Sequence, residues 1–335
     1  MSIFRKILAL GVAASLAVTP AIAQAVPVTV ALDWTPNTNH IGLYVAQAKG
    51  FYEEAGLAVE ILPYTDTSAG ALVANRVADF GILGSIGLFT QRAAGADLVA
   101  TYALVQTETG RLVFRADRDD IETPSDLDGK IYGGFGSAWE SALIGTIIRH
   151  DGGTGEFETI TLGTSAYEAL ANGAVDFTLE VYTWEGVKAE RDGPAQRAFR
   201  YADFGVPDQH TNFIGTSAAY LAANADTARA FITASQAGYD YAVAHPDEAT
   251  DILVAANADV LLDRDFVRAS LQALIDGHYL KGENGAVGTI DRAKMEAMAS
   301  FLFDAGILKD GDGVALASPP DVASAFTNAY LATTP

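Results

Sequence analysis

The sequence contains no cysteine among its 335 residues. This absence excludes a disulfide framework, a thiolate nucleophile, a cysteine-ligated zinc site and an iron–sulfur cluster. Basic residues are also scarce, because 21 Lys and Arg stand against 42 Asp and Glu, for a formal net charge of −21. Nucleic acids and anionic membranes are bound through basic patches, so neither is an expected partner.

Long apolar runs are missing except near the start of the chain. There Arg5 and Lys6 precede an apolar run over 7–18, which is followed by Pro20 and the small residues Ala21 and Ala23. No stretch reaches the roughly 18 apolar residues of a membrane-spanning helix, and this three-part pattern predicts a signal peptide over 1–23. Because a lipid anchor needs a cysteine, we expect a free periplasmic protein, not a lipoprotein, with no direct membrane insertion after signal cleavage.

Short apolar segments alternate with helical patterns along the rest of the chain. Hydrophobic residues make up 50% of the sequence, which is enough for a packed core. Strands are expected near 28–32, 57–62, 80–83 and 98–105, with helices near 41–49, 68–78 and 86–94 between them. This alternation predicts an α/β fold with a mostly parallel sheet flanked by helices.

A second series of strands and helices begins near 111–115. After it, a strand at 213–217 is followed only by helical patterns, and we expect this last part of the chain to return to the first lobe. A chain of this length also suggests about two domains. We therefore expect lobe one to comprise 26–108 and 213–335, with lobe two, 109–212, inserted between them. Two short crossovers would form a hinge, and ligands of such sheets bind at the carboxyl ends of the strands.

One loop at a strand end is dense in polar and aromatic groups. It brings together Asp33, Trp34, Asn37 and His40 within eight residues. An indole beside hydrogen-bonding groups suits a flat heteroaromatic ligand, which the ring stacks on and the polar groups orient.

Two segments of lobe two are further candidates. The glycine-rich run over 133–136 leads to Ser137 and either presents backbone N–H groups to an anion or makes a tight turn. After a later strand, alternation places Glu180 and Tyr182 on one face, with Trp184 close by. We expect Glu185 to be a solvated helix residue.

Enzyme motifs are absent from the sequence. There is no G-x-S-x-G or H-E-x-x-H motif, and the 5 histidines are scattered without metal-ligand spacing. We therefore expect a protein that is not an enzyme and holds no cofactor or metal.

Several short motifs, in a shared order, carry a family resemblance. They include Asp33-Trp34-x-Pro36 with His40, the run Ala46-Gln47-x-Lys49-Gly50-Phe51-Tyr52, Val77-Ala78-Asp79-Phe80-Gly81, Gly134-Phe135-Gly136, Leu179-Glu180, Ala244-His245-Pro246 and Pro319-Pro320-Asp321. The chain resembles the thiamine-pyrimidine family, which includes formylaminopyrimidine-binding proteins of ABC importers and fungal thiamine-pyrimidine synthases. The resemblance implies the type II periplasmic-binding-protein fold, with two lobes around one ligand.

Departures from the family pattern separate the two branches. Where the resemblance places the lysine and histidine of the synthases, this chain has Leu83 and Gly87, and the cysteine-rich iron motif has no cysteine. Leucine cannot form a Schiff base, so synthase chemistry is disfavoured. The binding branch carries a Tyr-Glu pair where this chain has His210-Thr211. Asp33, Glu108 or Glu180 are the candidates to supply the missing carboxylate.

We therefore expect a monomeric solute-binding protein of an ABC importer, which captures a small heteroaromatic thiamine precursor and delivers it to an inner-membrane permease. Riboflavin is the alternative ligand, and a synthase or a receptor-linked sensor is the alternative in another class. The expected ligand-binding residues are Asp33, Trp34, Asn37, His40, Ser85, Glu108, Gly134, Phe135, Ser137, Glu180, Tyr182, Trp184 and Asn212.

Overall fold

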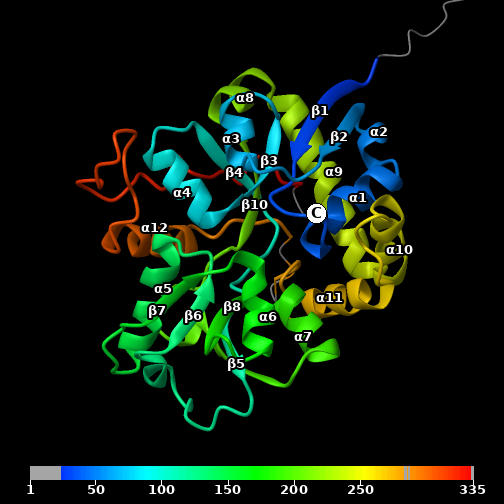
Figure 1. Cartoon of the computed structure of the whole chain (residues 1–335). Helices are drawn as coiled ribbons and strands as arrows, with labels where there is room; N and C mark the ends of the chain where they lie inside the picture. Colours follow the sequence, from blue (N-terminus) through cyan, green and yellow to red (C-terminus); the bar gives the residue numbers. More distant parts are fainter. Residues whose placement is uncertain (1–23, 283–284, 286, 333–335) are drawn as a thin grey trace, which may run out of the picture.

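This computed structural model describes residues 24–282, 285 and 287–332, so the expected signal peptide over 1–23 lies outside the described residues. Figure 1 shows two lobes, each built around one five-stranded sheet with helices packed against it. Within the described ranges, no helix combines the length and the apolar character that crossing a membrane requires.

The sheet of lobe one has the strand order β2-β1-β3-β10-β4. Its strands are β1 (Val26–Ala31), β2 (Leu57–Leu62), β3 (Phe80–Gly84), β4 (Leu98–Ala103) and β10 (Asn212–Ser217). The helices of this lobe are α1 (Ile41–Ala48), α2 (Phe51–Glu54), α3 (Ala69–Ala74), α4 (Ser85–Ala93), α8 (Ala218–Ala223), α9 (Ala225–Ala244), α10 (Pro246–Ala256), α11 (Arg264–Asp276) and α12 (Arg292–Asp304). β1 pairs in parallel with β2 and β3, whereas β10 runs antiparallel to both of its neighbours.

The sheet of lobe two has the equivalent order β7-β6-β8-β5-β9. Its strands are β5 (Gly110–Arg115), β6 (Ile131–Gly134), β7 (Glu158–Thr161), β8 (Phe177–Val181) and β9 (Gln196–Arg200), and its helices are α5 (Ala138–His150), α6 (Ala166–Ala171) and α7 (Val187–Asp192). β5 is antiparallel to β8 and β9, while β6 pairs in parallel with β7 and β8. The expected α/β class is therefore confirmed, but both sheets are mixed and not mostly parallel, because β10 and β5 each run antiparallel to both of their neighbours. The sequence analysis also assigned no strand to β9.

Two crossing segments, residues 104–109 and 201–211, connect the sheets. They run side by side, because the Leu104 N–H donates to the Asn212 carbonyl at 2.9 Å and the Thr211 N–H donates to the Val105 carbonyl at 3.3 Å. A pair of short crossovers of this kind is a natural hinge. The exact lobe boundaries, 26–108 with 213–335 for lobe one and 109–212 for lobe two, stay predictions.

The crossing of α1 and α9 depends on two glycines. A Cβ on Gly42 would lie 2.3 Å from the ring of Tyr239, and a Cβ on Gly238 would lie 2.1 Å from the Gly42 carbonyl oxygen. Only glycine permits this close approach. The Tyr239 hydroxyl then donates to the Asn39 carbonyl at 2.7 Å, so the packing of α9 holds the loop that precedes α1.

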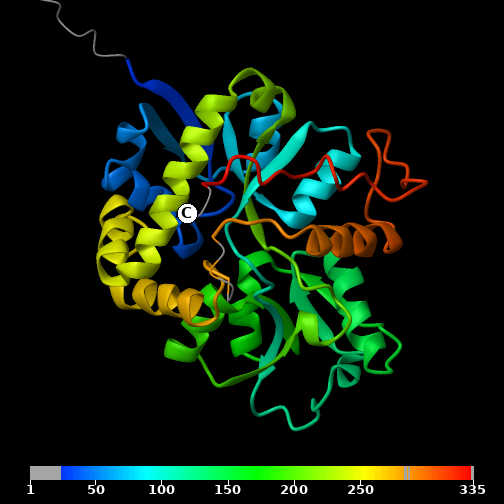
Figure 2. The same ribbon diagram turned by 180° about the vertical axis from the view of Figure 1, so that it is seen from behind.

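The C-terminal segment covers an edge of the first sheet. Figure 2 shows this segment in red, running across lobe one. The Ala100 N–H in β4 donates to the Ala325 carbonyl at 2.9 Å, and the Thr327 N–H donates to the Ala100 carbonyl at 2.9 Å. Covering the edge removes a row of unpaired backbone groups that could otherwise pair with another chain.

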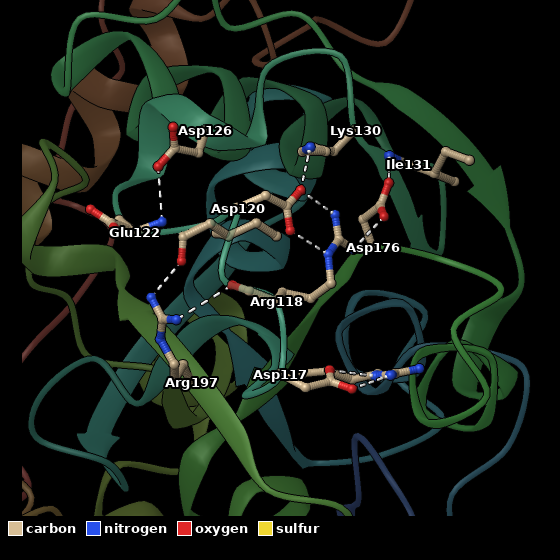
Figure 3. Close-up of polar contacts among 11 residues, drawn as sticks. Asp117, Arg118, Asp120, Glu122, Asp126, Lys130, Ile131, Asp176 and Arg197 are labelled. Atoms are coloured by element: carbon tan, nitrogen blue, oxygen red, sulfur yellow. Dashed lines mark hydrogen bonds and ion pairs between the residues drawn. The ribbon is translucent and has the colours of Figure 1, made fainter.

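An ion-pair network stabilises lobe two where strands β6 and β8 begin (Figure 3). Arg118 donates from Nε to Asp120 at 2.7 Å and also pairs with Asp176, while Lys130 donates to Asp120 at 2.7 Å. Asp176 also accepts from the Ile131 N–H at 2.7 Å. Arg118 and Lys130 hold the pKa of Asp120 below its usual range. The network ties together the starts of β6 and β8, whose carboxyl ends face the other lobe.

Candidate functional site

The loop after β1 is held by a chain of side-chain hydrogen bonds. Asp33 Oδ1 lies 2.8 Å from His40 Nε2, and Asp33 Oδ2 accepts from Asn212 Nδ2 at 2.6 Å. The Asn37 N–H donates to His40 Nδ1 at 3.3 Å, so the imidazole proton is on Nε2 and is donated to Asp33. His40 is fully buried, and its role is to orient the carboxylate of Asp33.

A cavity of about 250 Å³ lies between this loop and lobe two. Lobe one contributes the loop after β1, lobe two contributes the carboxyl ends of its strands, and the second crossover contributes the far wall. The lining residues are Asp33, Trp34, Asn37, Asn39, Phe135, Thr164, Tyr167, Leu179, Val181, Trp184, Glu185, Thr211 and Asn212. The cavity therefore sits where a two-lobed α/β protein binds its ligand.

Six of the residues expected from the sequence line this cavity. They are Asp33, Trp34, Asn37, Phe135, Trp184 and Asn212. His40 lies directly behind Asp33, to which it is hydrogen-bonded. The structure thus brings together residues from the loop after β1, from lobe two and from the start of β10.

Glu180, in β8, and Tyr182, directly after β8, both contact Arg111, as the alternation predicts, but neither lines this cavity. Arg111 donates from Nε to Glu180 at 2.8 Å, and its guanidinium lies 4.3 Å from the centre of the Tyr182 ring. Leu179 and Val181, on the opposite face of the strand, line the cavity instead. We therefore leave Tyr182 out of the proposed ligand contacts and keep Glu180 only for a ligand that extends into an adjoining cavity, which Glu180 lines.

The glycine-rich turn after β6 is already occupied by a carboxylate of the protein. Glu140 is 1% exposed and accepts from the Phe135 N–H at 3.1 Å, the Ser137 N–H at 2.7 Å and the Ser137 hydroxyl at 2.9 Å. It also accepts from the Tyr132 hydroxyl at 2.9 Å. An added Cβ on Gly134 would lie 2.2 Å from that same hydroxyl, so Gly134 is a close-packing residue of the turn. The Phe135 and Ser137 N–H groups, which an external anion would use, are thus satisfied by Glu140, and neither Gly134 nor Ser137 lines the cavity.

Ser85 and Glu108 belong to a buried network at the hinge. The Ser85 hydroxyl donates to Gln209, whose amide donates to Glu108. The other oxygen of Glu108 accepts from the Thr109 N–H at 2.8 Å and from the Gly110 N–H at 2.6 Å. Burial raises the pKa of Glu108. Neither Ser85 nor Glu108 lines the cavity, so their place is in the joint between the lobes.

A π-helical turn over Tyr182–Gly186 places two further groups at the cavity. Such turns are frequent at functional sites because the extra residue redirects side chains. Trp184 and Glu185 both line the cavity, which contradicts the expectation that Glu185 is a solvated helix residue. Its Oε2 is shielded from solvent without a hydrogen-bond partner among the described residues, and burial raises its pKa to about 7.

Sequence reasoning also missed Tyr167, Asn39 and Thr211 as residues that line the cavity. Tyr167 lies in the first turn of α6, where nothing in the local sequence distinguishes it from a core residue. The sequence could have indicated Asn39, because this residue lies in the polar loop after β1. Thr211 directly precedes the predicted Asn212 in the second crossover.

α11 holds the π-helical turn against lobe one. The Ser270 hydroxyl donates to the Thr183 carbonyl at 2.5 Å and lies 2.6 Å from the Thr38 hydroxyl, which therefore acts as the donor to Ser270. The rings of Trp184 and Phe266 are 4.5 Å apart. These contacts join the loop after β1, α11 and the π-helical turn, and they fix two walls of the cavity relative to each other.

Comparisons with known proteins were made for the sequence and for the structure. A family model described as NMT1/THI5 like matches residues 37–249. The chain is 27% identical over 282 residues to the formylaminopyrimidine-binding protein of Halalkalibacterium halodurans, covering 82% of this chain and 84% of that protein. It is 25% identical over 322 residues to the riboflavin-binding protein RibY of Chloroflexus aurantiacus, covering 91% and 86%. It is 23% identical over 234 residues to the 4-amino-5-hydroxymethyl-2-methylpyrimidine phosphate synthase THI13 of Saccharomyces cerevisiae, covering 66% and 68%.

Among solved structures, the periplasmic aliphatic sulphonate binding protein SsuA from Escherichia coli superposes with a TM-score of 0.67. The sequence identity is 15%, and the match covers 89% of this chain and 91% of that chain. A likeness at this identity concerns the fold alone. It confirms the two-lobed periplasmic-binding-protein fold that the sequence predicts.

Proposed function

The chain belongs to the NMT1/THI5-like family, and from this membership and the cavity we propose that it is a periplasmic solute-binding protein of an ABC importer. Its proposed ligand is a small heteroaromatic thiamine precursor of the formylaminopyrimidine or hydroxymethylpyrimidine type, captured between the lobes and delivered to a permease. Ligand contacts to both lobes would favour the closed form, because the bound state gains contacts that the open form lacks. The monomeric state and export through residues 1–23 are part of this proposal.

The lining of the cavity carries the proposal. Four aromatic side chains, Trp34, Phe135, Tyr167 and Trp184, surround two carboxyl groups and three side-chain amides. No lysine or arginine is found among the described residues that line it. Aromatic rings provide stacking surfaces for a flat ring, and carboxyl and amide oxygens accept from amino groups. This combination suits a neutral or cationic aminopyrimidine.

The internal capping by Glu140 supports the same ligand class. In an α/β fold, the turn at the start of a helix next to a ligand cavity is the usual place for an anion. Here Glu140 accepts from the Phe135 and Ser137 N–H groups, and a second anion beside this carboxylate would be repelled. A ligand without a phosphate or sulfonate group is therefore favoured.

Riboflavin is the second candidate, and one observation favours it. A further cavity of about 460 Å³ adjoins the first and shares Tyr167, Trp184 and Glu185 with it. A three-ring flavin would need this additional space, whereas a single pyrimidine ring would not.

A synthase is disfavoured by the residues at the positions that matter for its chemistry. Leu83 stands where the resemblance places the Schiff-base lysine, and it is 3% exposed and packed in the core of lobe one. The sequence has no cysteine for the iron motif. Absence of turnover with pyridoxal phosphate, iron and oxygen would be consistent with a binding protein.

The direct test of the proposal is native mass spectrometry of protein purified from the periplasm. We expect a complex with one small molecule, whose mass after release matches an aminopyrimidine. Release of a flavin would instead support riboflavin, the second candidate ligand. A ligand without an aromatic ring would contradict both.

Replacing Trp34 by alanine is expected to weaken binding of 4-amino-5-hydroxymethyl-2-methylpyrimidine by about five- to 150-fold. Stacking of one base on an aromatic side chain contributes about 1–3 kcal/mol, and 1.4 kcal/mol corresponds to a factor of ten. Isothermal titration calorimetry measures the change. The control is Trp139→Ala, because Trp139 is partly buried against the core of lobe two and does not line the cavity. Affinity within about threefold of the wild type for Trp34→Ala would exclude the stacking role.

A further inference from the structure

The two carboxyl groups of the cavity differ in how they are engaged. Both oxygens of Asp33 already accept hydrogen bonds, one from His40 at 2.8 Å and one from Asn212 at 2.6 Å. Glu185 also lines the cavity, and its Oε2 has no partner among the described residues. Each oxygen of Asp33 thus has a partner within the protein, whereas Glu185 Oε2 has none among the described residues, so Glu185 is the less engaged of the two carboxyl groups and the stronger candidate for a ligand contact.

We propose that Glu185 recognises the amino-substituted edge of the ligand ring, as a neutral carboxylic acid that forms two hydrogen bonds with it. This inference rests on the proposed function, because it names the group that selects an aminopyrimidine in that same cavity. A neutral carboxyl has one O–H donor and one carbonyl acceptor. A ring nitrogen beside an amino-bearing carbon offers one acceptor and one N–H donor at matching spacing.

The surroundings of Glu185 favour its neutral form in the empty protein. Trp184 precedes it on the π-helical turn, and Tyr167 of α6 lines the cavity beside it. A carboxylate shielded from water needs several hydrogen-bond donors or a cation to remain charged. Burial raises the pKa of Glu185 to about 7, with the nearby charge of Glu180 acting in the same direction and the N–H groups of Glu185 and Val181 opposing it.

The charged groups around Glu185 are otherwise paired. Lys188 of α7 pairs with Asp192, and Arg111 of β5 pairs with Glu180 of β8. On α11, Asp263 lies 3.7 Å from Arg191. The titratable and charged groups that line the two cavities beside Glu185 are Asp33, Tyr167, Glu180 (paired with Arg111), Lys188 and Asp192, and the Asp263–Arg191 pair lies at the neighbouring helices α11 and α7. Among the described residues, none of these cations forms an ion pair with Glu185.

Because Glu185 must be protonated before it can form this pair, the affinity for the pyrimidine is expected to depend on pH. When the ring nitrogen is the stronger base in the complex, the carboxyl proton moves to it and a charge-assisted pair forms, with the total number of protons unchanged. Free Glu185 loses its proton as the pH rises through about 7, so binding of the uncharged pyrimidine then takes up one proton. The Kd is expected to be flat between pH 6 and about 7 and to rise toward about tenfold per pH unit above it. The pKa of buried His210 is lowered to about 4, outside this range.

The test is calorimetric titration of 4-amino-5-hydroxymethyl-2-methylpyrimidine from pH 6 to 8.5, in buffers of different ionisation enthalpy. The wild type is expected to take up close to one proton at pH 8.5. Glu185→Gln keeps one donor and one acceptor without a titration, so its Kd at pH 6 should stay within about tenfold of the wild type and lose its pH dependence. Glu185→Leu removes both hydrogen bonds and should weaken binding about 100-fold at pH 6.

The matched control is Glu190→Gln, because Glu190 lies on α7 with 59% of its side chain exposed and does not line the cavity. It should keep the pH profile of the wild type, and equal melting temperatures would show that the variants fold. Failure of the wild type to bind the pyrimidine at any pH would overturn the proposed function, and this assignment with it. Three results would overturn the role of Glu185 alone: a wild type that binds without proton uptake, a Glu185→Gln variant with the pH profile of the wild type, or equal losses for glutamine and leucine at pH 6.

Discussion

Replacing Glu140 by alanine is expected to lower the free energy of unfolding by about 4 kcal/mol. The carboxylate is 1% exposed and accepts four hydrogen bonds, from the Tyr132 hydroxyl, the Phe135 N–H, and the N–H and hydroxyl of Ser137. A buried donor left without an acceptor costs about 1–3 kcal/mol, and partial hydration of the new space reduces the sum. Urea denaturation followed by circular dichroism measures the loss.

Two control variants separate the capping role of Glu140 from its charge. Glu140→Gln keeps one acceptor oxygen but places an NH₂ group opposite donors, so about half of the loss is expected. Glu168→Ala removes an exposed acid of α6 and should change stability by less than about 0.5 kcal/mol. A change below about 1 kcal/mol for Glu140→Ala would contradict the capping role.

The Glu140→Ala variant is also expected to gain an anion-binding site. Without Glu140, the N–H groups of Phe135 and Ser137 would point into an empty space at the start of α5, which has the geometry of an anion cradle. Added sulfate should therefore raise the melting temperature of Glu140→Ala more than that of the wild type. Equal responses would show that the turn rearranges when the carboxylate is removed.

The capping of this turn was readable from the sequence. Ser137 and Glu140 form an S-x-x-E pattern, which is the signature of a capping box at the start of a helix. The sequence analysis considered an external anion or a tight turn and did not use this spacing. The structure has the capping box, so a local rule was sufficient at this position.

The positions of Glu180 and Tyr182 show the limit of periodicity arguments. Alternation along a strand states which residues share a face, and both side chains do contact Arg111. It does not state which face is turned toward the other lobe. That choice is set by the helices packed on each face, so Leu179 and Val181 reached the cavity instead.

The fold was more predictable than the site because its signals are local and repeated. The alternation of strands and helices, the return of the chain at β10 and the position of most elements follow from hydrophobic period and turn residues. The short strand β9 was missed because Gln196–Arg200 has a single buried aromatic, Phe199, and its only other apolar residue is the small Ala198. The burial of Glu185 was also beyond local reasoning, since it depends on α6 and on a π-helical turn held by α11.

Replacing Asp33 by asparagine is expected to weaken binding of the pyrimidine about 100-fold and to destabilise the protein by about 2–3 kcal/mol. Asp33 accepts from two donors that lie in different segments, His40 on the adjoining loop and Asn212 at the start of β10. An asparagine side chain can accept from one of them only, and its NH₂ group must face the other. His40 cannot adapt by changing its tautomer, because its Nδ1 accepts from the Asn37 N–H at 3.3 Å. The NH₂ group of the new asparagine therefore either opposes the NH₂ group of Asn212 or makes the Asn212 amide turn over, which changes the group that Asn212 presents in the wall of the cavity.

The matched control for this prediction is Asp79→Asn, at the other end of the same sheet. Asp79 also accepts from two donors, the N–H of Thr29 at 2.8 Å and its hydroxyl at 3.0 Å, but both bonds end on its Oδ2, so an asparagine can keep both, and it does not line the cavity between the lobes. Only Asp33→Asn should lose both stability in thermal unfolding and affinity in calorimetry, whereas Asp79→Asn should keep the affinity of the wild type and lose little stability. Equal affinities for the two variants would mean that Asp33 supports the fold without shaping the site. A large loss of affinity confined to Asp33→Asn would instead show that ligand binding depends on how Asn212 and the loop after β1 are oriented in lobe one.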